Sequence, residues 1–332
     1  MLINCREENK KTIEKLIPIQ ETFSIEKEND PQYSFYYPQD IKIDRDGNIY
    51  VLDTNNSRIQ IFNRNGEYLR TIGEPGQGPG EFNKPESIYI DETENMIYIS
   101  DTRNQRLQVF SLDGKFISLI KLNFAPQQVV LSNSNIYVTR FPSTMVYGNS
   151  PKSKSLIKKL DRNGNIINEF LIPLDTGYHL TNLLVNSITI TTDENNNLIC
   201  AYKLGINRIM KFDHKDNMVL EFKTIYKAWE WAKPGEFINI SSEEDIEKLA
   251  YVVADIACDK ENNIYILSGN LEKKKDGNFE KAREIYKFDP YGKYTGTLIL
   301  PLKVQLIEFD KENHLFIIDH NFIIRKFKLL SK

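Results

Sequence analysis

The 332-residue sequence has few of the residues that usually build redox, metal or membrane chemistry. It contains 3 cysteines and 4 histidines, and the cysteine spacings match no zinc or redox pattern. It has no run of about 18 apolar residues that would predict a membrane-spanning helix. The formal net charge of −3 is spread over interspersed acids and bases, which argues against nucleic acid as the main partner.

The sequence also lacks the short motifs of well-known enzyme classes. It contains no G-x-S-x-G, no H-E-x-x-H and no glycine loop of the kind that binds phosphate. These absences exclude the recognisable serine hydrolases, zinc proteases and P-loop nucleotide binders, and they favour a binding function over a catalytic one.

Two stretches of the sequence are near copies of one another, residues 38–73 and residues 85–120. Each contains four short segments of alternating apolar and polar residues, separated by turns rich in Asp, Asn and Gly. Four weaker copies follow. A period of roughly 45 to 50 residues with four strands per unit is typical of a β-propeller, in which the units stack around an axis. We therefore predict an all-β fold, a six-bladed β-propeller of four-stranded antiparallel blades.

We expect a single propeller from residue 17 to residue 332, preceded by a tail or anchor remnant at residues 1–16. The sixth unit contains only three strand segments. The segment 17–27 belongs to no unit, so we expect it to pair as the outer strand of the last blade and to close the ring. The expected blades span about residues 38–73, 85–121, 126–173, 184–225, 254–301, and 304–330 together with 17–27.

The connection between the second and third strands carries a specific pattern in the first two units. Residues 53–62 read DTNNSRIQIF and residues 101–110 read DTRNQRLQVF, and the connection before unit two, residues 78–85, reads GPGEFNKP. These segments resemble the signatures of NHL repeats. The resemblance implies that the aspartate and arginine of each copy form a structural clasp, a charge-assisted hydrogen bond across the loop. The implied clasp residues are Asp53 with Arg58 and Asp101 with Arg106.

The pattern weakens in the later units. Unit four keeps Arg208 but has Lys203 at the aspartate position, and unit five has Glu284 at the arginine position. Unit six keeps Asp319, but its loop is one residue shorter and the arginine position falls on Ile323. The resemblance is therefore specific in the first two units.

Loop lengths predict two unlike faces. In a propeller, the connections from the second to the third strand and from one blade to the next lie on one face, and the other turns lie on the opposite face. We call the first the decorated face and the second the trimmed face, because all long connections belong to the first. Long loops on a rigid scaffold usually bind ligands, so we expect the binding site there. The long connections are residues 74–84, 141–155, 174–187, 226–253 and 269–283.

Seven residues that map to the decorated face are candidates for ligand binding. The two tryptophans could stack on a sugar, peptide or aromatic ligand. The alternative is that they anchor a short helix predicted in the 226–253 connection, which begins at Ser241 or Ser242. The candidate residues are Tyr36, Tyr37, Arg140, His179, Trp229, Trp231 and His320.

Two functions are compatible with this pattern. The first is a non-catalytic module that binds a peptide, glycan or protein at the decorated face, with no cofactor. The alternative is a metal-dependent hydrolase or lyase, because six-bladed relatives of NHL repeats include lactonases and lyases with a metal such as Ca²⁺ or Zn²⁺ in the central channel. The inner strands carry mainly apolar and hydroxyl residues near the channel mouth, so no set of three metal ligands is visible.

The three cysteines bear on the cellular location of the protein and on its core. The first five residues, MLINC, resemble the end of a bacterial lipoprotein signal, which implies an extracytoplasmic protein with a lipid on Cys5 and no other membrane contact. The match is partial, because no apolar stretch precedes it and Asn4 stands where a small residue is usual. The alternative is a chance match in a cytoplasmic protein. Cys200 and Cys258 lie in strand patterns, where we expect small buried side chains.

Overall fold

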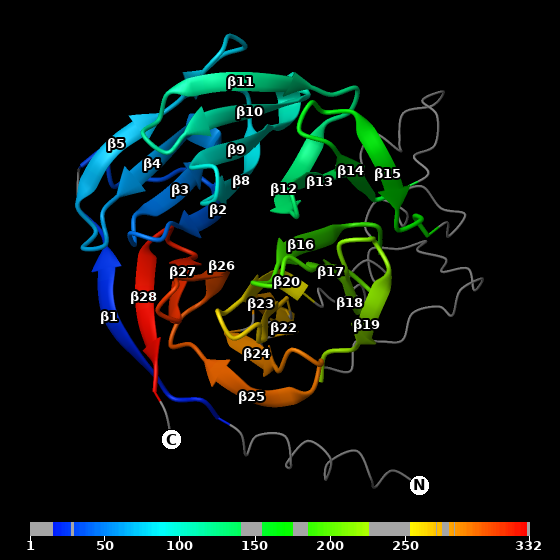
Figure 1. Ribbon diagram of the computed structural model, residues 1–332. Helices are drawn as coiled ribbons and strands as arrows, with labels where there is room; N and C mark the ends of the chain where they lie inside the picture. The colour runs from blue at the N-terminus through cyan, green and yellow to red at the C-terminus, as the bar shows by residue number, and fades with distance from the viewer. Residues whose placement is uncertain are drawn as a thin grey trace, which may run out of the picture.

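The structure is a computed structural model that describes residues 16–27, 30–140, 155–174, 185–225, 253–269, 271–273, 279–281 and 283–330. Within these residues, six four-stranded antiparallel sheets surround a central channel (Figure 1). The predicted six-bladed β-propeller is confirmed. The short helix expected in the 226–253 connection falls outside the described residues.

The first three blades follow one another along the chain, each from its inner to its outer strand. Blade 1 consists of β2 (Pro38–Ile43), β3 (Ile49–Asp53), β4 (Arg58–Phe62) and β5 (Tyr68–Ile72). Blade 2 consists of β8 (Pro85–Asp91), β9 (Met96–Asp101), β10 (Arg106–Ser111) and β11 (Phe116–Lys121). Blade 3 consists of β12 (Pro126–Ser132), β13 (Asn135–Arg140), β14 (Ile157–Leu160) and β15 (Ile166–Phe170).

The last three blades complete the ring, and the sixth takes its outer strand from the other end of the chain. Blade 4 consists of β16 (Ile188–Thr192), β17 (Leu198–Tyr202), β18 (Ile209–Phe212) and β19 (Met218–Phe222). Blade 5 consists of β20 (Val253–Cys258), β21 (Ile264–Ser268), β24 (Glu284–Phe288) and β25 (Tyr294–Ile299). Blade 6 consists of β26 (Val304–Phe309), β27 (His314–Asp319), β28 (Ile324–Leu329) and β1 (Ile19–Ile25).

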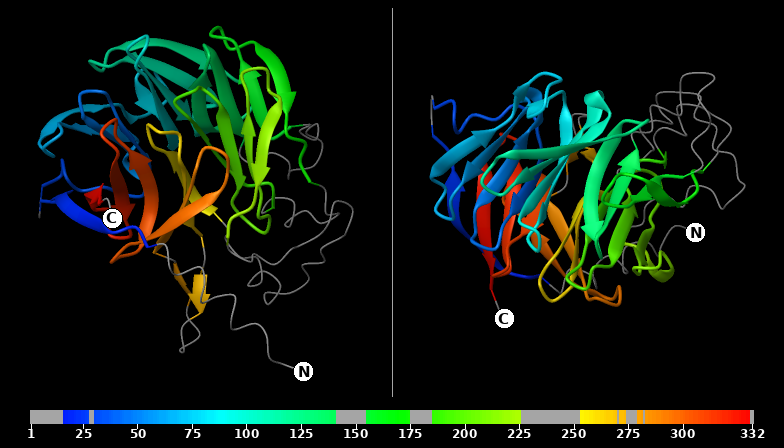
Figure 2. Two further views of the ribbon diagram at one scale, coloured as in Figure 1. Left: turned by 60° about the horizontal axis from the view of Figure 1, so that its bottom comes forward. Right: turned by 45° about the horizontal axis from the view of Figure 1, so that its top comes forward.

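Short elements occupy the connections on the decorated face. A β22–β23 hairpin inserted in blade 5 projects away from the ring (Figure 2). The other short elements are the 3₁₀ helices η1 (Thr54–Asn56) and η2 (Thr102–Asn104), the parallel pair β6 (Glu74–Pro75) and β7 (Glu81–Phe82), and the hairpin strands β22 (Leu271–Lys273) and β23 (Phe279–Lys281).

The blades are held together by apolar side chains on both faces of each sheet. Alternate residues of a strand point to opposite faces, so one strand can serve two neighbours. In β3, Ile49 and Val51 pack toward blade 6, whereas Tyr50 and Leu52 pack toward blade 2. Six apolar clusters of this kind lie between successive blades. A blade removed from the ring would expose both of its apolar faces.

The end of the ring is closed by β1. This strand pairs antiparallel with β28, with Ile25 opposite Ile324 and Ile19 opposite Leu329. Ile25 is 2% exposed and packs in the cluster between blades 6 and 1. Figure 1 shows the first and last strands of the chain side by side at this point. The predicted closure of the last blade by the N-terminal segment is confirmed.

Side chains of the inner strands fasten neighbouring blades to one another at four of the six junctions. Five of the six inner strands contain an irregularity near their start. At or next to this position, a side-chain oxygen accepts the backbone N–H of the next inner strand and so satisfies a donor that the open sheet edge would leave unpaired. The pairs are Asp40 with Ile88, Ser87 with Val129, Gln128 with Ile190, and Asp255 with Ile307, at N to O distances of 2.9, 3.3, 2.9 and 2.9 Å.

The short turns of the trimmed face are built on aspartates. Asp44 accepts the backbone N–H of Asp46 and of Asn48 at 2.9 and 2.8 Å, which fixes the turn between β2 and β3. The same arrangement recurs at Asp193, Asp259 and Asp310. These turns leave little chain beyond the sheets on this face.

Candidate binding surface

The structure brings together the aspartate and arginine of both NHL-like loops. Arg58 Nε lies 2.9 Å from Asp53 Oδ2, and Arg106 Nε lies 2.7 Å from Asp101 Oδ2. Both aspartate side chains are 0% exposed. Burial removes water as a competitor, so each carboxylate depends on its arginine and on the loop N–H groups for hydrogen bonds.

Each arginine also orders the chain that leads into an inner strand. The Arg58 guanidinium donates to the carbonyls of Pro31 and Ser34 at 3.1 and 2.8 Å. The Arg106 guanidinium donates to the carbonyls of Gln77, Gly78 and Glu81 in the same way. The clasp therefore fixes the segment that precedes each of the first two blades on the decorated face.

A third clasp occurs in blade 6, where the sequence did not indicate one. Arg325 Nε lies 3.0 Å from Asp319 Oδ2. Ile323 is the residue opposite Asp319, as the sequence indicated, and the arginine of this clasp lies two residues further along the chain. Across this tight turn, Ile323 N donates to Asp319 Oδ1 at 3.0 Å. Arg325, on β28, lies beside the same carboxylate.

Blade 4 has no such clasp. As the sequence indicated, its aspartate is replaced by Lys203, and Arg208 instead bonds Glu221 on the outer strand at 2.8 Å.

Two tyrosines stand exposed at the start of blade 1. Tyr36 and Tyr37 are 54% and 52% exposed, and their ring centroids are 5.4 Å apart. The Tyr37 ring also lies 5.3 Å from the ring of Phe322, which comes from the turn between β27 and β28 of blade 6. We call these three residues the aromatic ridge. The ridge crosses the seam between the first and last blades on the decorated face.

The clasp of blade 1 holds the ridge in place. Tyr36 N donates to Asp53 Oδ1 at 2.7 Å, and the Tyr36 carbonyl accepts Asn55 N at 3.1 Å. The second oxygen of the same carboxylate accepts a hydrogen bond from Arg58 Nε. The Tyr36 backbone is therefore tied to a buried ion pair although its ring is in water.

An open hollow of about 1010 Å³ lies beside the ridge, and we call it the seam hollow. It is bordered by Phe322, by the end of β1 and by the segment that precedes blade 1. The charged residues among its described lining are two acids and two bases, and one of the bases, Arg58, is already paired with Asp53. They are Glu26, Lys27, Asp30 and Arg58, and the other lining residues include Ile25, Tyr33, Asn56 and Asn321.

The remaining candidates are dispersed. His320 precedes Phe322 in the same turn, and its backbone N donates to the Lys303 carbonyl at 3.2 Å. Arg140 ends β13 in blade 3, where its guanidinium lies 5.8 Å from the Phe124 ring centroid and burial lowers its pKa. The structure therefore groups Tyr36, Tyr37 and His320 near one seam and places Arg140 on a different blade. His179, Trp229, Trp231 and Cys5 lie outside the described residues.

The central channel contains charged residues that sequence reasoning missed. A cavity of about 470 Å³ runs between the inner strands. Lys42 pairs with Glu308 across the junction of blades 1 and 6, and its Nζ lies 3.5 Å from Asp40 Oδ1. The inner strands are therefore more polar than the expected apolar and hydroxyl lining. The signal was present in the sequence as DIKID and IEFD, where charges alternate with buried isoleucine or phenylalanine.

Burial shifts the pKa of the channel groups. Burial raises the pKa of Asp255 to about 6, against the hydrogen bond from Ile307 N. It likewise raises the pKa of Glu86, at the decorated end of the channel, to about 7. For Lys42, burial lowers the pKa, but the carboxylates of Asp40 and Glu308 more than offset it and the net shift is upward. Lys42 is therefore a permanent cation in the channel.

A lysine bridges the trimmed end of the channel. Lys311 Nζ, from the β26–β27 turn of blade 6, lies 2.8 Å from Glu194 Oε1 in blade 4 and 3.9 Å from Glu92 Oε2 in blade 2. These blades are not neighbours, so the side chain spans the mouth of the channel. All three residues line the channel cavity.

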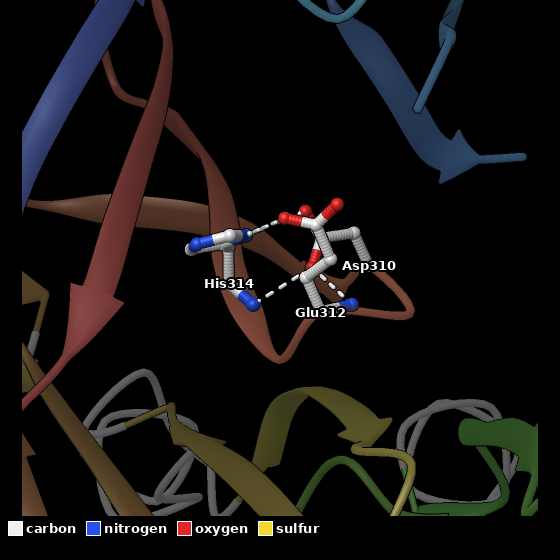
Figure 3. A group of neighbouring side chains, drawn as sticks. All are labelled: Asp310, Glu312 and His314. Atoms are coloured by element: carbon white, nitrogen blue, oxygen red, sulfur yellow. Dashed lines mark hydrogen bonds and ion pairs between the residues drawn. The ribbon is translucent and has the colours of Figure 1, made fainter. Parts of the chain in front are cut away.

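One group of side chains within the described residues has the composition of a metal site. It consists of Asp310, Glu312 and His314 in the β26–β27 turn (Figure 3). Asp310 Oδ2 already contacts His314 Nδ1 at 2.9 Å and Lys326 Nζ at 3.2 Å. The group is thus a variant of the aspartate turn, and it lies away from the ridge. In blades 1, 4 and 5 an asparagine holds the position of His314 and bonds the same carboxylate, namely Asn48, Asn197 and Asn263.

Comparisons with known proteins support the fold. Residues 37–187 match a family described as "Domain of unknown function (DUF4934)". No curated protein is similar enough in sequence to be matched with the chain. Within the described residues, no helix is long and apolar enough to cross a membrane.

Several solved structures share the architecture at low identity. A Bacteroides fragilis NCTC 9343 protein, provisionally described as exported, is 14% identical with a TM-score of 0.61, covering 94% of this chain and 96% of that one. A DUF4221 member from Bacteroides vulgatus ATCC 8482 is 13% identical with a TM-score of 0.61, covering 95% and 99%. Virginiamycin B lyase from Staphylococcus aureus is 13% identical with a TM-score of 0.56, covering 95% and 100%. Similarity at this level shows the fold alone.

Proposed function

We propose that this propeller is a non-catalytic binding module and that its decorated face binds a peptide, glycan or protein. The observation that carries the proposal is that Tyr36 and Tyr37 are each more than half exposed while the clasp fixes the backbone that presents them. Exposed aromatic rings on a rigid scaffold offer a large contact area with little entropy to lose on binding.

We further propose that the blades are of the NHL type and that the protein works outside the cytoplasm, with a lipid on Cys5. The clasps of blades 1, 2 and 6 support the first assignment. The provisionally exported structural neighbour supports the second, since it covers most of this chain. Mass spectrometry of the native protein tests the lipid, because an unmodified Cys5 would contradict it.

The second candidate function is a metal-dependent hydrolase or lyase acting in the channel. Propeller neighbours described as streptogramin B lyase and virginiamycin B lyase favour it. In the described part of the channel, however, the Lys42 ammonium already contacts Asp40 and Glu308, and a bound metal would have to compete with it for these two carboxylates. Elemental analysis after dialysis against Ca²⁺ and Zn²⁺ tests this. One retained ion per chain would favour the enzyme.

The binding proposal is tested on peptide and glycan arrays. We compare the wild type with the double variant Tyr36→Ala/Tyr37→Ala and with Tyr291→Ala. Tyr291 is a matched control because it is 84% exposed in the β24–β25 turn of the trimmed face. We expect the double variant to lose the bound ligands and Tyr291→Ala to keep them. The opposite pattern, or chemical conversion of the ligand, would refute the proposal.

A further inference from the structure

Two residues of the aromatic ridge have a backbone conformation that bulky side chains rarely adopt. The φ angles of Tyr37 and Phe322 are 54° and 63°. For aromatic residues this left-handed region is an outlier that costs free energy, and such residues concentrate at functional sites. The two outliers contact each other, with ring centroids 5.3 Å apart.

The chain shows what normally occupies the position of Phe322. The turn at Asp319 closes with a bond from Phe322 N to the Asp319 carbonyl at 3.0 Å. Seven turns of the trimmed face close in the same way at 2.9 to 3.1 Å, from the fourth residue to an aspartate carbonyl. In all seven the fourth residue has positive φ and is asparagine, glycine or aspartate, which tolerate this region. The asparagines are Asn196, Asn262 and Asn313, with φ of 58°, 63° and 64°, and the others are Gly47, Gly164, Asp216 and Gly292.

Phe322 is therefore an unfavourable choice for its turn, and packing explains it only in part. Its side chain is half-buried, packs against the apolar cluster between blades 6 and 1, and borders both the ridge and the seam hollow. An asparagine would relieve the turn but would remove the ring from the hollow. The ring lies between Tyr37 and the hollow, so a contact at this surface is what Phe322 contributes in exchange for the strained backbone.

The chemistry of the hollow indicates the class of ligand. Arg58 is already paired with Asp53, so Glu26, Asp30 and Lys27 are the remaining described charges, and they offer no net attraction to an acidic ligand. The amides of Asn56 and Asn321 line it beside the ring of Phe322. Aromatic faces combined with polar groups suit a ligand that has both apolar ring faces and neutral hydroxyl groups.

We propose that the aromatic ridge and the seam hollow together bind a neutral oligosaccharide across blades 6 and 1, with Phe322 as a binding residue. The inference rests on the proposed function and narrows its ligand to a glycan. Sugar rings stack on Tyr36, Tyr37 and Phe322, and their hydroxyl groups reach the polar lining of the hollow. Figure 1 shows the two blades meeting where β1 and β28 face blade 1.

The first arm of the test replaces the turn phenylalanine by asparagine at one position and a turn asparagine by phenylalanine at another. Phe322→Asn is expected to weaken glycan binding about tenfold, as expected for loss of one stacked ring. The matched control Asn313→Phe places the same strain on the trimmed face, so it is expected to lower Tm and leave binding unchanged. A folded Phe322→Asn variant that binds as tightly as the wild type would overturn the assignment of Phe322.

The second arm fixes the ligand class by calorimetry. The probes are neutral oligosaccharides of hexose and N-acetylhexosamine units, uronic-acid oligosaccharides, and peptides. Binding of a neutral oligosaccharide that Tyr36→Ala/Tyr37→Ala abolishes is the expected result. If only peptides or acidic sugars bind and the double variant abolishes that binding, the glycan inference fails and the binding module stands. If no binding depends on Tyr36 and Tyr37, both fail.

Discussion

Two arginine–carboxylate pairs of this protein differ mainly in their exposure to water. The side chains of Asp101 and Arg106 are 0% and 9% exposed, whereas those of Glu221 and Arg208 are 42% and 38% exposed. A buried carboxylate that loses its partner remains charged in a poor solvent, whereas an exposed one is rehydrated. The same geometric contact therefore has different energetic weight in blades 2 and 4.

The first prediction compares these pairs. Arg106→Ala is expected to lower the free energy of unfolding by about 3–5 kcal/mol, because Asp101 is left buried and the loop carbonyls lose their donor. Arg208→Ala is expected to cost less than about 1 kcal/mol. Urea denaturation of both variants measures the difference. Equal losses would show that the clasp does not stabilise the fold more than a surface pair does.

The second prediction concerns Asp255. Its folded pKa of about 6 exceeds the ordinary value of 3.8, so the folded state holds the proton more tightly. The contribution of Asp255 to stability therefore falls as pH rises from about 4 to about 6, and the charged form is a penalty above that range. Asp255→Asn keeps an oxygen for Ile307 N without the charge. We expect Asp255→Asn to be about 1–2 kcal/mol more stable than the wild type at pH 7.5.

Denaturation curves from pH 4 to pH 7.5 provide the check. The advantage of Asp255→Asn should shrink toward zero near pH 4, where the wild-type carboxyl is protonated. Asp113→Asn serves as a control on the trimmed face, because hydrogen bonds from Lys115 and Ser111 lower the pKa of Asp113. An advantage that is constant with pH would mean that the charge of Asp255 is not the cause.

At the scale of single elements, β1 has more influence than its length suggests. It supplies the outer strand of blade 6, and its alternation places Ile25 in the core and Ser24 in solvent. A sheet edge left without this strand would expose the N–H and C=O groups of β28 as well as apolar side chains. Closure by β1 therefore joins the two ends of the chain.

The third prediction tests this closure. Deleting residues 1–27 is expected to lower Tm by roughly 10 °C, and adding a peptide of residues 17–27 should restore part of the loss. Ile25→Ala should cost about 2–4 kcal/mol in urea denaturation, because it leaves a cavity between blades 6 and 1. Ser24→Ala, its exposed neighbour, should stay within about 0.5 kcal/mol. A truncated protein of unchanged stability would contradict the role of β1.

The elements that the sequence predicts best are those with local signals. The alternation of apolar and polar residues, together with turn residues such as Asp, Asn and Gly, predicts the four strands of each blade. The N-terminal strand of blade 6 is predicted because the sixth unit contains only three strand segments. The clasp at Arg325 could not be predicted, because this arginine lies two residues beyond Ile323, the residue opposite Asp319. Tyr36 and Tyr37 could be identified as candidates, but Phe322 could not. Its contact with Tyr37 arises only when the ring closes.

At the scale of the whole molecule, the propeller has two unlike faces. On the trimmed face, turns capped by aspartates interlock, and Lys311 bridges the channel mouth between Glu194 and Glu92. On the decorated face, the described residues present the aromatic ridge and the seam hollow. The ring provides the rigidity, and the connections of one side provide the surface that a ligand contacts.

The central claim is that this surface, and not the channel, binds the ligand. Hydrogen–deuterium exchange of the wild type, with and without a ligand retained from the arrays, tests it most directly. The account predicts protection of residues 31–37 and 319–323, which carry the ridge and border the hollow. Protection confined to the channel strands or to the trimmed turns at residues 91–94, 193–196 and 310–313 would contradict it.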